Sequence, residues 1–197
     1  FSSNYTLYGD MSARVMATLG RFVDDVEVYS IDEAFLNLKG YETVYPDIAL
    51  FAHTIRSTVK QWTRIPTSVG IAPTKTLAKM ANWYAKRDVS HNQSDGPGVY
   101  CLNSPERIED ALLGFSVDDL WGIGSRYAAL LRRNGIRTAA QLAALPDDWI
   151  NQHLTVNGLR LAYELRGVPC KMLEVEPPAK KAICTAPSFG RGVHDLD

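Results

Sequence analysis

The stretch that decides the fold reads Val26-Glu27-Val28-Tyr29-Ser30-Ile31-Asp32-Glu33-Ala34-Phe35-Leu36-Asn37-Leu38. Two runs of apolar, β-branched and aromatic residues flank an adjacent pair of carboxylates, which predicts two strands meeting at or near Asp32 and Glu33. Neighbouring strand positions point to opposite faces, so both acids can reach one ion only if the backbone turns there. The alternative is an ordinary hairpin tip with solvated acids, because an Asp-Glu pair alone is a weak signal.

One helix is predicted on the N-terminal side of this strand pair, and helices and further strands are predicted on its C-terminal side. Apolar spacing and breakers predict helices over 4–19, from 46–47 to a break at Pro66, and over 75–87, with strands over 67–72 and 99–102 and a polar loop over 91–98. Asn4 and Thr74 are candidate N-caps. One face of the second helix is expected to consist of Ile48, Phe51, Ala52, Ile55, Val59 and Trp62. This order predicts an α/β or α+β sheet covered by helices.

Three lysines lie along one face of the helix predicted over 75–87. At about 100° per residue, Lys79 and Lys86 fall within about 40° of Lys75, and Asn82 lies on the same stripe. Stacked ammonium groups with no acid among them repel one another unless water or a polyanion lies between them. A triphosphate is the sharper interpretation, because lysine acts as a point charge on phosphate oxygens. A solvated outer face is the alternative.

Only helices are predicted between 104 and 167. Ser116 is expected to cap a short helix that ends at Trp121-Gly122-Ile123-Gly124, Ser125 to cap the next, and further helices to cover 138–145 and 154–166. Two glycines bracketing one apolar residue predict a helix-hairpin-helix near 117–134, whose free N–H groups suit a nucleic-acid phosphate. Four arginines follow with no acid among them, at Arg126, Arg132, Arg133 and Arg137. The alternative is a tight turn with solvated arginines.

Composition limits the classes of protein that remain. The 197 residues are 46% hydrophobic, enough for one domain or two small ones with a real core. A net charge of −1 argues against a generic DNA-coating protein, so any nucleic-acid contact must come from local clusters. The three cysteines are far apart and fit neither a disulfide framework nor a zinc site. Without a signal peptide or an apolar run of ~20 residues, we expect a cytoplasmic protein.

The stretch Ser30-Ile31-Asp32-Glu33-Ala34-Phe35 resembles the signature of Y-family (translesion) DNA polymerases. Further blocks match that family in the same order, namely Phe1-Ser2-Ser3-Asn4-Tyr5 with Tyr8-Gly9-Asp10-Met11-Ser12, then Val69-Gly70-Ile71-Ala72-Pro73-Thr74-Lys75-Thr76-Leu77-Ala78-Lys79, and Asp119-Leu120-Trp121-Gly122-Ile123-Gly124. Several blocks in register make this a specific match. Within the family, the chain is most similar to the branch of the bacterial SOS polymerase V.

The resemblance implies template-directed nucleotidyl transfer past damaged bases, as part of the SOS response to DNA damage. Two Mg²⁺ ions would activate the primer hydroxyl and neutralise the leaving pyrophosphate. Asp32 and Glu33 would bind these ions, and Lys79 and Lys86 would contact the triphosphate of the incoming deoxynucleotide. Primer-template DNA would be held by the turn that contains Gly122, Ile123, Gly124, Ser125 and Arg126. UmuD′-like and RecA-like accessory proteins would be partners.

The same resemblance implies the domain division. Residues 1–104 would form a partial palm, 105–175 a thumb, and 176–197 a linker with the first strand of an absent little-finger domain. Family members carry a first metal-binding aspartate and a fingers region upstream of the block that matches Phe1. A start at Phe rather than Met also indicates an excised piece. We therefore expect a fragment that lacks polymerase activity by itself.

Two other function classes stay open on the sequence. A non-catalytic DNA-backbone-binding module would bind DNA with an affinity indifferent to Asp32 and to magnesium-nucleotide. A nucleotidyl cyclase, whose sheet can also carry paired acids, would form a cyclic product from nucleotide alone. The predicted DNA-binding turn argues against the cyclase.

Overall fold

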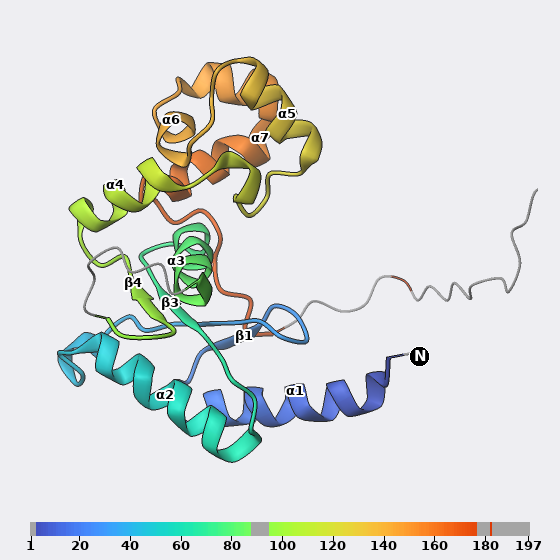
Figure 1. The fold of residues 1–197 in the computed structure, drawn as a ribbon, viewed down its shortest axis with the longest axis vertical. Helices are drawn as coiled ribbons and strands as arrows, with labels where there is room; N and C mark the ends of the chain where they lie inside the picture. Colours follow the sequence, from blue (N-terminus) through green and yellow to red (C-terminus); the bar gives the residue numbers. More distant parts are fainter. Residues whose placement is uncertain (1–2, 88–94, 177–181, 183–197) are drawn as a thin grey trace, which may run out of the picture.

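The computed structural model describes residues 3–87, 95–176 and 182. The elements follow in the order α1 (Tyr5–Leu19), β1 (Val26–Val28), β2 (Ala34–Leu36), η1 (Tyr41–Thr43), α2 (Ile48–Thr63), β3 (Val69–Ile71), α3 (Lys75–Arg87), β4 (Val99–Cys101), α4 (Pro105–Gly114), η2 (Val117–Asp119), α5 (Ser125–Arg133), α6 (Ala139–Ala143) and α7 (Asp147–Leu165). Figure 1 shows α1 and α2 at one end, the strands and α3 in the middle, and α4 to α7 at the other end. Phe1 and Ser2, the first half of the loop predicted over 91–98 and the strand expected near the end of the 176–197 segment, from Ile183 on, lie outside the described residues.

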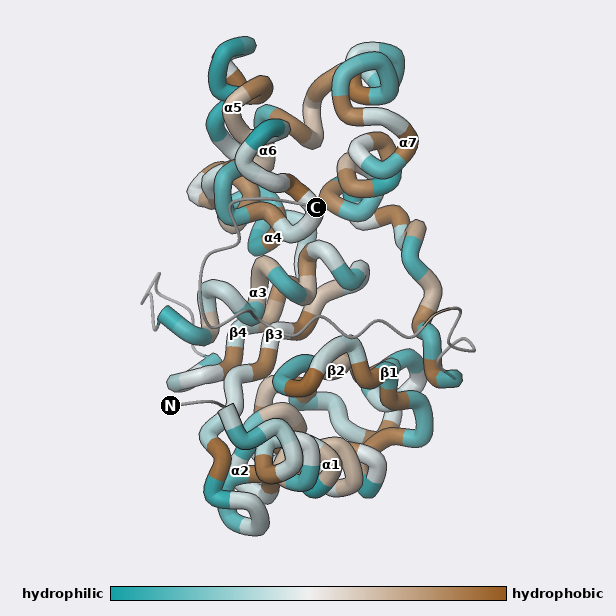
Figure 2. The backbone as a smooth tube through the Cα atoms, turned by 90° about the vertical axis from the view of Figure 1, so that its right-hand side faces the viewer, coloured by the Kyte–Doolittle hydropathy of each residue, from teal (hydrophilic) through white to brown (hydrophobic). Residues whose placement is uncertain are grey.

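The predicted strand pair is an antiparallel hairpin. β1 and β2 pair with Val26 opposite Leu36 and Val28 opposite Ala34. The parallel pair of β3 and β4 forms a second two-stranded sheet, so the described residues hold two separate sheets where one was expected. The mixed helix and strand class is confirmed. Figure 2 shows α1 and α2 below both sheets and α3 above the β3–β4 pair.

Helices α1 and α2 begin where the sequence predicts. The Asn4 side-chain oxygen accepts the Leu7 N–H at the start of α1. The Asp47 carboxylate accepts the Leu50 N–H at the start of α2. The apolar face of α2 packs on Val23, but Trp62 is 54% exposed, so its predicted place in that face was wrong. Residue i+4 from Val59 lies closer in angle than i+3, and Thr63 is the buried residue of the last turn.

Helix α3 packs closely on β3 through a glycine. A Cβ added at Gly70 would meet the backbone N of Asn82 at 2.2 Å and the carbonyl O of Ala78 at 2.5 Å. Only a residue without a side chain allows this approach. The bounds predicted for α3, residues 75–87, agree with the structure.

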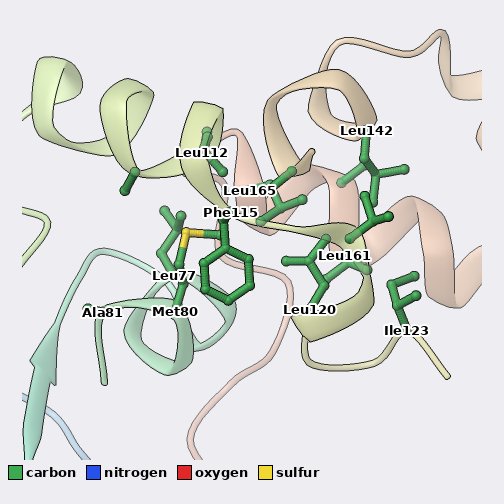
Figure 3. Close-up of a cluster of buried hydrophobic side chains, with 14 of the residues drawn as sticks. Leu77, Met80, Ala81, Leu112, Phe115, Leu120, Ile123, Leu142, Leu161 and Leu165 are labelled. Carbon is green, nitrogen blue, oxygen red and sulfur yellow. The ribbon is translucent and has the colours of Figure 1, made fainter. Parts of the chain in front are cut away.

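One apolar core runs from α3 into the helical group α4 to α7. Figure 3 shows Leu77 and Met80 of α3 packed with Phe115, Leu161 and Leu165. Because these side chains are all buried, the hydrophobic effect holds α3 to the helical group as well as to its own sheet.

Several boundaries in the helical group differ from prediction. Thr138 caps α6 through a capping box with Gln141, but that helix ends at Ala143 and not at Leu145. Helix α7 starts at Asp147, seven residues before the predicted start, and is interrupted at Thr155, whose φ is 63°. The predicted start therefore fell next to this kink. Pro146, which follows α6, occupies the N-cap position of α7. Among the helices described, none is long and apolar enough to cross a bilayer.

Candidate active site and nucleic-acid interface

The loop between β1 and β2 presents the two predicted metal-binding acids. The N–H groups of Tyr29 and Ser30 both donate to the Glu33 carbonyl at 3.0 Å, which closes a tight turn. Asp32 is exposed, and its carboxylate accepts the Ser30 hydroxyl at 2.7 Å. The turn thus brings Asp32 and Glu33 off the strands, as a shared ion would require.

Each of two acids from the hairpin is paired with a lysine of α3. Glu33 forms an ion pair with Lys79, and Glu27 forms one with Lys75. The Glu27 carboxylate also accepts the Glu174 N–H at 2.7 Å, and the Lys75 ammonium donates to the Met172 carbonyl at 2.7 Å. Acids 46 and 48 residues away in sequence therefore relieve the repulsion expected along the lysine stripe.

The third lysine of the stripe has a different environment. Lys86 is exposed, and the described part of the chain offers it no ion pair. Seven residues of helix separate it from Lys79, about 10 Å along the axis. Asn82 does not share this exposure, because its side-chain oxygen accepts the Ser68 hydroxyl at 2.6 Å and ties α3 to the start of β3.

The two hairpin acids fit a divalent cation in chemistry, though their number is small. Carboxylate oxygens are the hard ligands that Mg²⁺ prefers. The described residues contain no group of three or more His, Cys, Asp or Glu side chains placed to hold a metal ion. Asp32 and Glu33 could therefore supply part of a coordination shell, with Glu33 already engaged by Lys79 in this structure.

The glycine turn before α5 leaves the helix N-terminus open. Gly122 has φ 94°, and Ile123 is buried with its N–H bonded to the Leu120 carbonyl at 2.9 Å. Gly124, and not Ser125 as predicted, occupies the N-cap position, so no side chain accepts the first N–H groups of α5. Ser125 and Arg126 are the first two helical residues and both are exposed.

The predicted arginine patch is smaller than the sequence indicated. Arg132 forms an ion pair with Asp118 of η2, an acid that precedes the turn. Arg126, Arg133 and Arg137 are exposed, and within the described ranges none of them has an ion pair. Three guanidinium groups and a helix N-terminus thus remain to attract an anion.

An aromatic cluster that sequence reasoning missed joins the glycine turn to the hairpin. The Trp121 indole N–H donates to the Tyr29 hydroxyl at 3.1 Å, and the two rings meet edge to face at 5.5 Å. Phe35 lies 5.9 Å from Trp121, and the Lys171 ammonium lies 3.6 Å from the indole centroid. Burial lowers the pKa of Lys171, with a smaller contribution from the charge of Lys75. A tryptophan beside a glycine turn was the only signal in the sequence.

Glu164 is a second residue that the sequence analysis missed. It is completely buried in α7, and its carboxylate accepts the N–H and hydroxyl of Thr76 at 2.9 and 2.6 Å and the N–H groups of Cys170 and Lys171 at 3.1 and 2.9 Å. It therefore caps α3 and fixes the chain that leaves α7. An acid among Leu161, Ala162 and Leu165 was the available signal.

The chain is similar in sequence and in fold to known proteins. Residues 1–83 match the impB/mucB/samB family. The whole chain is 45% identical to the protein UmuC of Salmonella typhimurium, of which it covers 46%. A DinB family error-prone DNA polymerase from Sulfolobus solfataricus superposes with a TM-score of 0.65 at 27% identity, over 84% of this chain and 48% of that one.

A chimeric Y-family DNA polymerase built on Dbh superposes with a TM-score of 0.66 at 27% identity, over 90% of this chain and 49% of that chain. The chain thus spans about half the length of the relatives it matches. The chain is therefore similar to the impB/mucB/samB family over residues 1–83 and to Y-family DNA polymerases over most of its length.

Proposed function

We propose that this chain is part of a translesion DNA polymerase, which extends a primer past damaged template bases by two-metal nucleotidyl transfer. The observation that carries the proposal is the pairing of Glu33 with Lys79. It brings a carboxylate suited to a divalent ion against a lysine suited to a triphosphate, from elements far apart in sequence. The similarity to UmuC along the whole chain supports the same interpretation of both residues.

In this proposal each part of the site has one role. Asp32 and Glu33 would hold divalent ions, which would activate the primer hydroxyl and offset charge on the leaving pyrophosphate. Lys79 and Lys86 offset charge on the triphosphate. The turn at Gly122, with the arginines that follow it, holds the DNA backbone. UmuD′-like and RecA-like proteins remain predicted partners of the full-length protein.

Primer extension by the full-length protein tests the catalytic roles. Replacing Asp32 or Glu33 with Ala should lower the extension rate about 100-fold or more, because metal ligands contribute several kcal/mol of transition-state stabilisation. Asp24→Ala is the matched control, since Asp24 is an exposed acid just before β1. Full activity in the Asp32 variant would remove that residue from the site. The chain alone should not extend a primer, since two carboxylates are few for two ions.

A non-catalytic DNA-binding module is the second candidate, favoured by the open N-terminus of α5 and its unpaired arginines. Arg126→Ala should weaken binding of the 197-residue chain to any duplex and reduce the salt slope by about one. Lys60→Ala removes the same charge from α2 at the opposite end of the molecule (Figure 1) and should change neither quantity. Binding that ignores Asp32 and magnesium-nucleotide in the full-length protein would favour the module over the polymerase.

A further inference from the structure

Lys79 is partly buried, although it is one of the two lysines assigned to the triphosphate. Its ammonium lies 5.6 Å from the centroid of the Tyr29 ring and 6.0 Å from that of Trp121, and it is paired with Glu33. The Lys79 side chain is 22% exposed. Lys86, two turns further along the same stripe, is exposed. The two lysines therefore offer an anion very different access.

The two rings beside Lys79 form a cover that joins separate parts of the fold. Tyr29 belongs to the hairpin loop and Trp121 to the glycine turn before α5, 92 residues later. Their hydrogen bond and edge-to-face contact hold the cover closed, and the Lys171 ammonium beside the indole adds a cation–π contact. The faces of aromatic rings attract cations and repel anions, so the cover stabilises the Lys79 ammonium and disfavours a phosphate beside it.

We propose that Tyr29 and Trp121 are positioning residues that shield Lys79, and that phosphate oxygens reach this lysine only after Trp121 moves away from Tyr29. Opening the cover would also let Glu33 exchange Lys79 for another partner. The inference rests on the proposed function only for the identity of the anion, a triphosphate. The shielding itself follows from the described contacts.

Acetylation of lysines by a limiting amount of acetic anhydride, followed by peptide mass spectrometry, tests the shielding in the 197-residue chain. In the wild type, Lys79 should react more slowly than Lys86. Trp121→Ala should raise the rate at Lys79 about fivefold to tenfold, the loss expected for one hydrogen bond and the ring contacts, and leave Lys86 unchanged. Trp62→Ala is the control, because Trp62 is a half-exposed tryptophan on α2.

Milder variants distinguish opening of the cover from unfolding of the chain. Trp121→Phe and Tyr29→Phe each remove the hydrogen bond and keep a ring, so each should raise the Lys79 rate by a smaller factor. Inorganic tripolyphosphate should then protect Lys79 from acetylation at a lower concentration in Trp121→Ala than in the wild type. Thermal unfolding of every variant shows whether the chain remains folded.

Three results would overturn the inference. Lys79 reacting as fast as Lys86 in the wild type would show that no shield exists. An unchanged Lys79 rate in folded Trp121 variants would show that the rings do not limit access. A rise in Glu33→Gln without one in Trp121→Ala would assign the protection to the ion pair alone. None of these measurements uses DNA or primer extension, so failure of the proposed function leaves a distinct signature.

Discussion

Gly70→Ala should be among the most damaging single-methyl changes in the chain. The new Cβ would lie 2.2, 2.5 and 2.7 Å from backbone atoms of Asn82, Ala78 and Ala81 in α3. Contacts of this kind need at least 3.0–3.4 Å, so α3 must retreat from β3 by about 1 Å. A helix backbone cannot relieve the clash by changing a rotamer.

The loss in the free energy of unfolding can be estimated from other overpacked sites. Overpacking costs about 1–3 kcal/mol, and a clash with rigid backbone belongs at the upper end, about 3 kcal/mol of the free energy of unfolding. For a chain of this size that corresponds to a fall in Tm of about 6–12 °C. Calorimetry gives the change in Tm, and urea unfolding gives the change in the free energy of unfolding. Because Lys79 and Lys86 belong to α3, both lysines should move with the helix.

A matched glycine variant should move stability in the opposite direction. Gly9 lies on the exposed face of α1, and a Cβ added there would meet nothing within 4 Å, so Gly9→Ala should stabilise the chain by about 0.5–1 kcal/mol. If Gly70→Ala unfolds within about 0.5 kcal/mol of the wild type while Gly9→Ala behaves as expected, the close packing of α3 on β3 is refuted.

Three further predictions concern groups away from β3. Glu164→Leu should cost about 3–5 kcal/mol of stability, measured by urea unfolding, because it leaves two buried and two part-buried donors without their acceptor, whereas Glu164→Gln should cost less by keeping an acceptor. Burial raises the pKa of Cys101 to about 12, so at pH 8 only about one thiol in ten thousand is ionised, and iodoacetamide should label Cys170 well before Cys101; equal labelling in the folded chain would contradict its burial. The Tyr163 hydroxyl, followed by Arg166, lowers the pKa of Asp147, so the stability that Asp147 contributes is present above pH ~4 and lost as pH falls through the lowered pKa. The difference in Tm between the wild type and Asp147→Asn should accordingly shrink on acidification, and a constant difference would oppose this assignment.

Local patterns predicted the elements well where one face decides the structure. The hairpin around Asp32 and the bounds of α3 follow from period and capping. The start of α7 was missed because the helical pattern restarts after the kink at Thr155, a backbone feature that no periodicity encodes. Trp62 was misplaced because spacing alone cannot say where the supporting core ends.

The sequence named candidate site residues but could not give their pairings. The types and spacing of Asp32, Glu33, Lys79 and Lys86, together with the family resemblance, predicted ion and phosphate chemistry, and those roles stay predictions. That Glu33 holds Lys79 and that Trp121 lies over Tyr29 depends on how hairpin, helix and turn pack, across 46 and 92 residues of sequence. Tertiary packing, not local propensity, sets such contacts.

The core shared by α3 and the helical group limits how the chain can be divided. A cut at residue 104, the predicted end of the palm, would leave Leu77, Met80 and Tyr84 without the helices that bury them. The separated halves would each expose a continuous apolar surface and would tend to aggregate when expressed alone. Anyone seeking a smaller folded piece should keep α3 with the helices that follow it, so that the hairpin and its acids become the part that is added back.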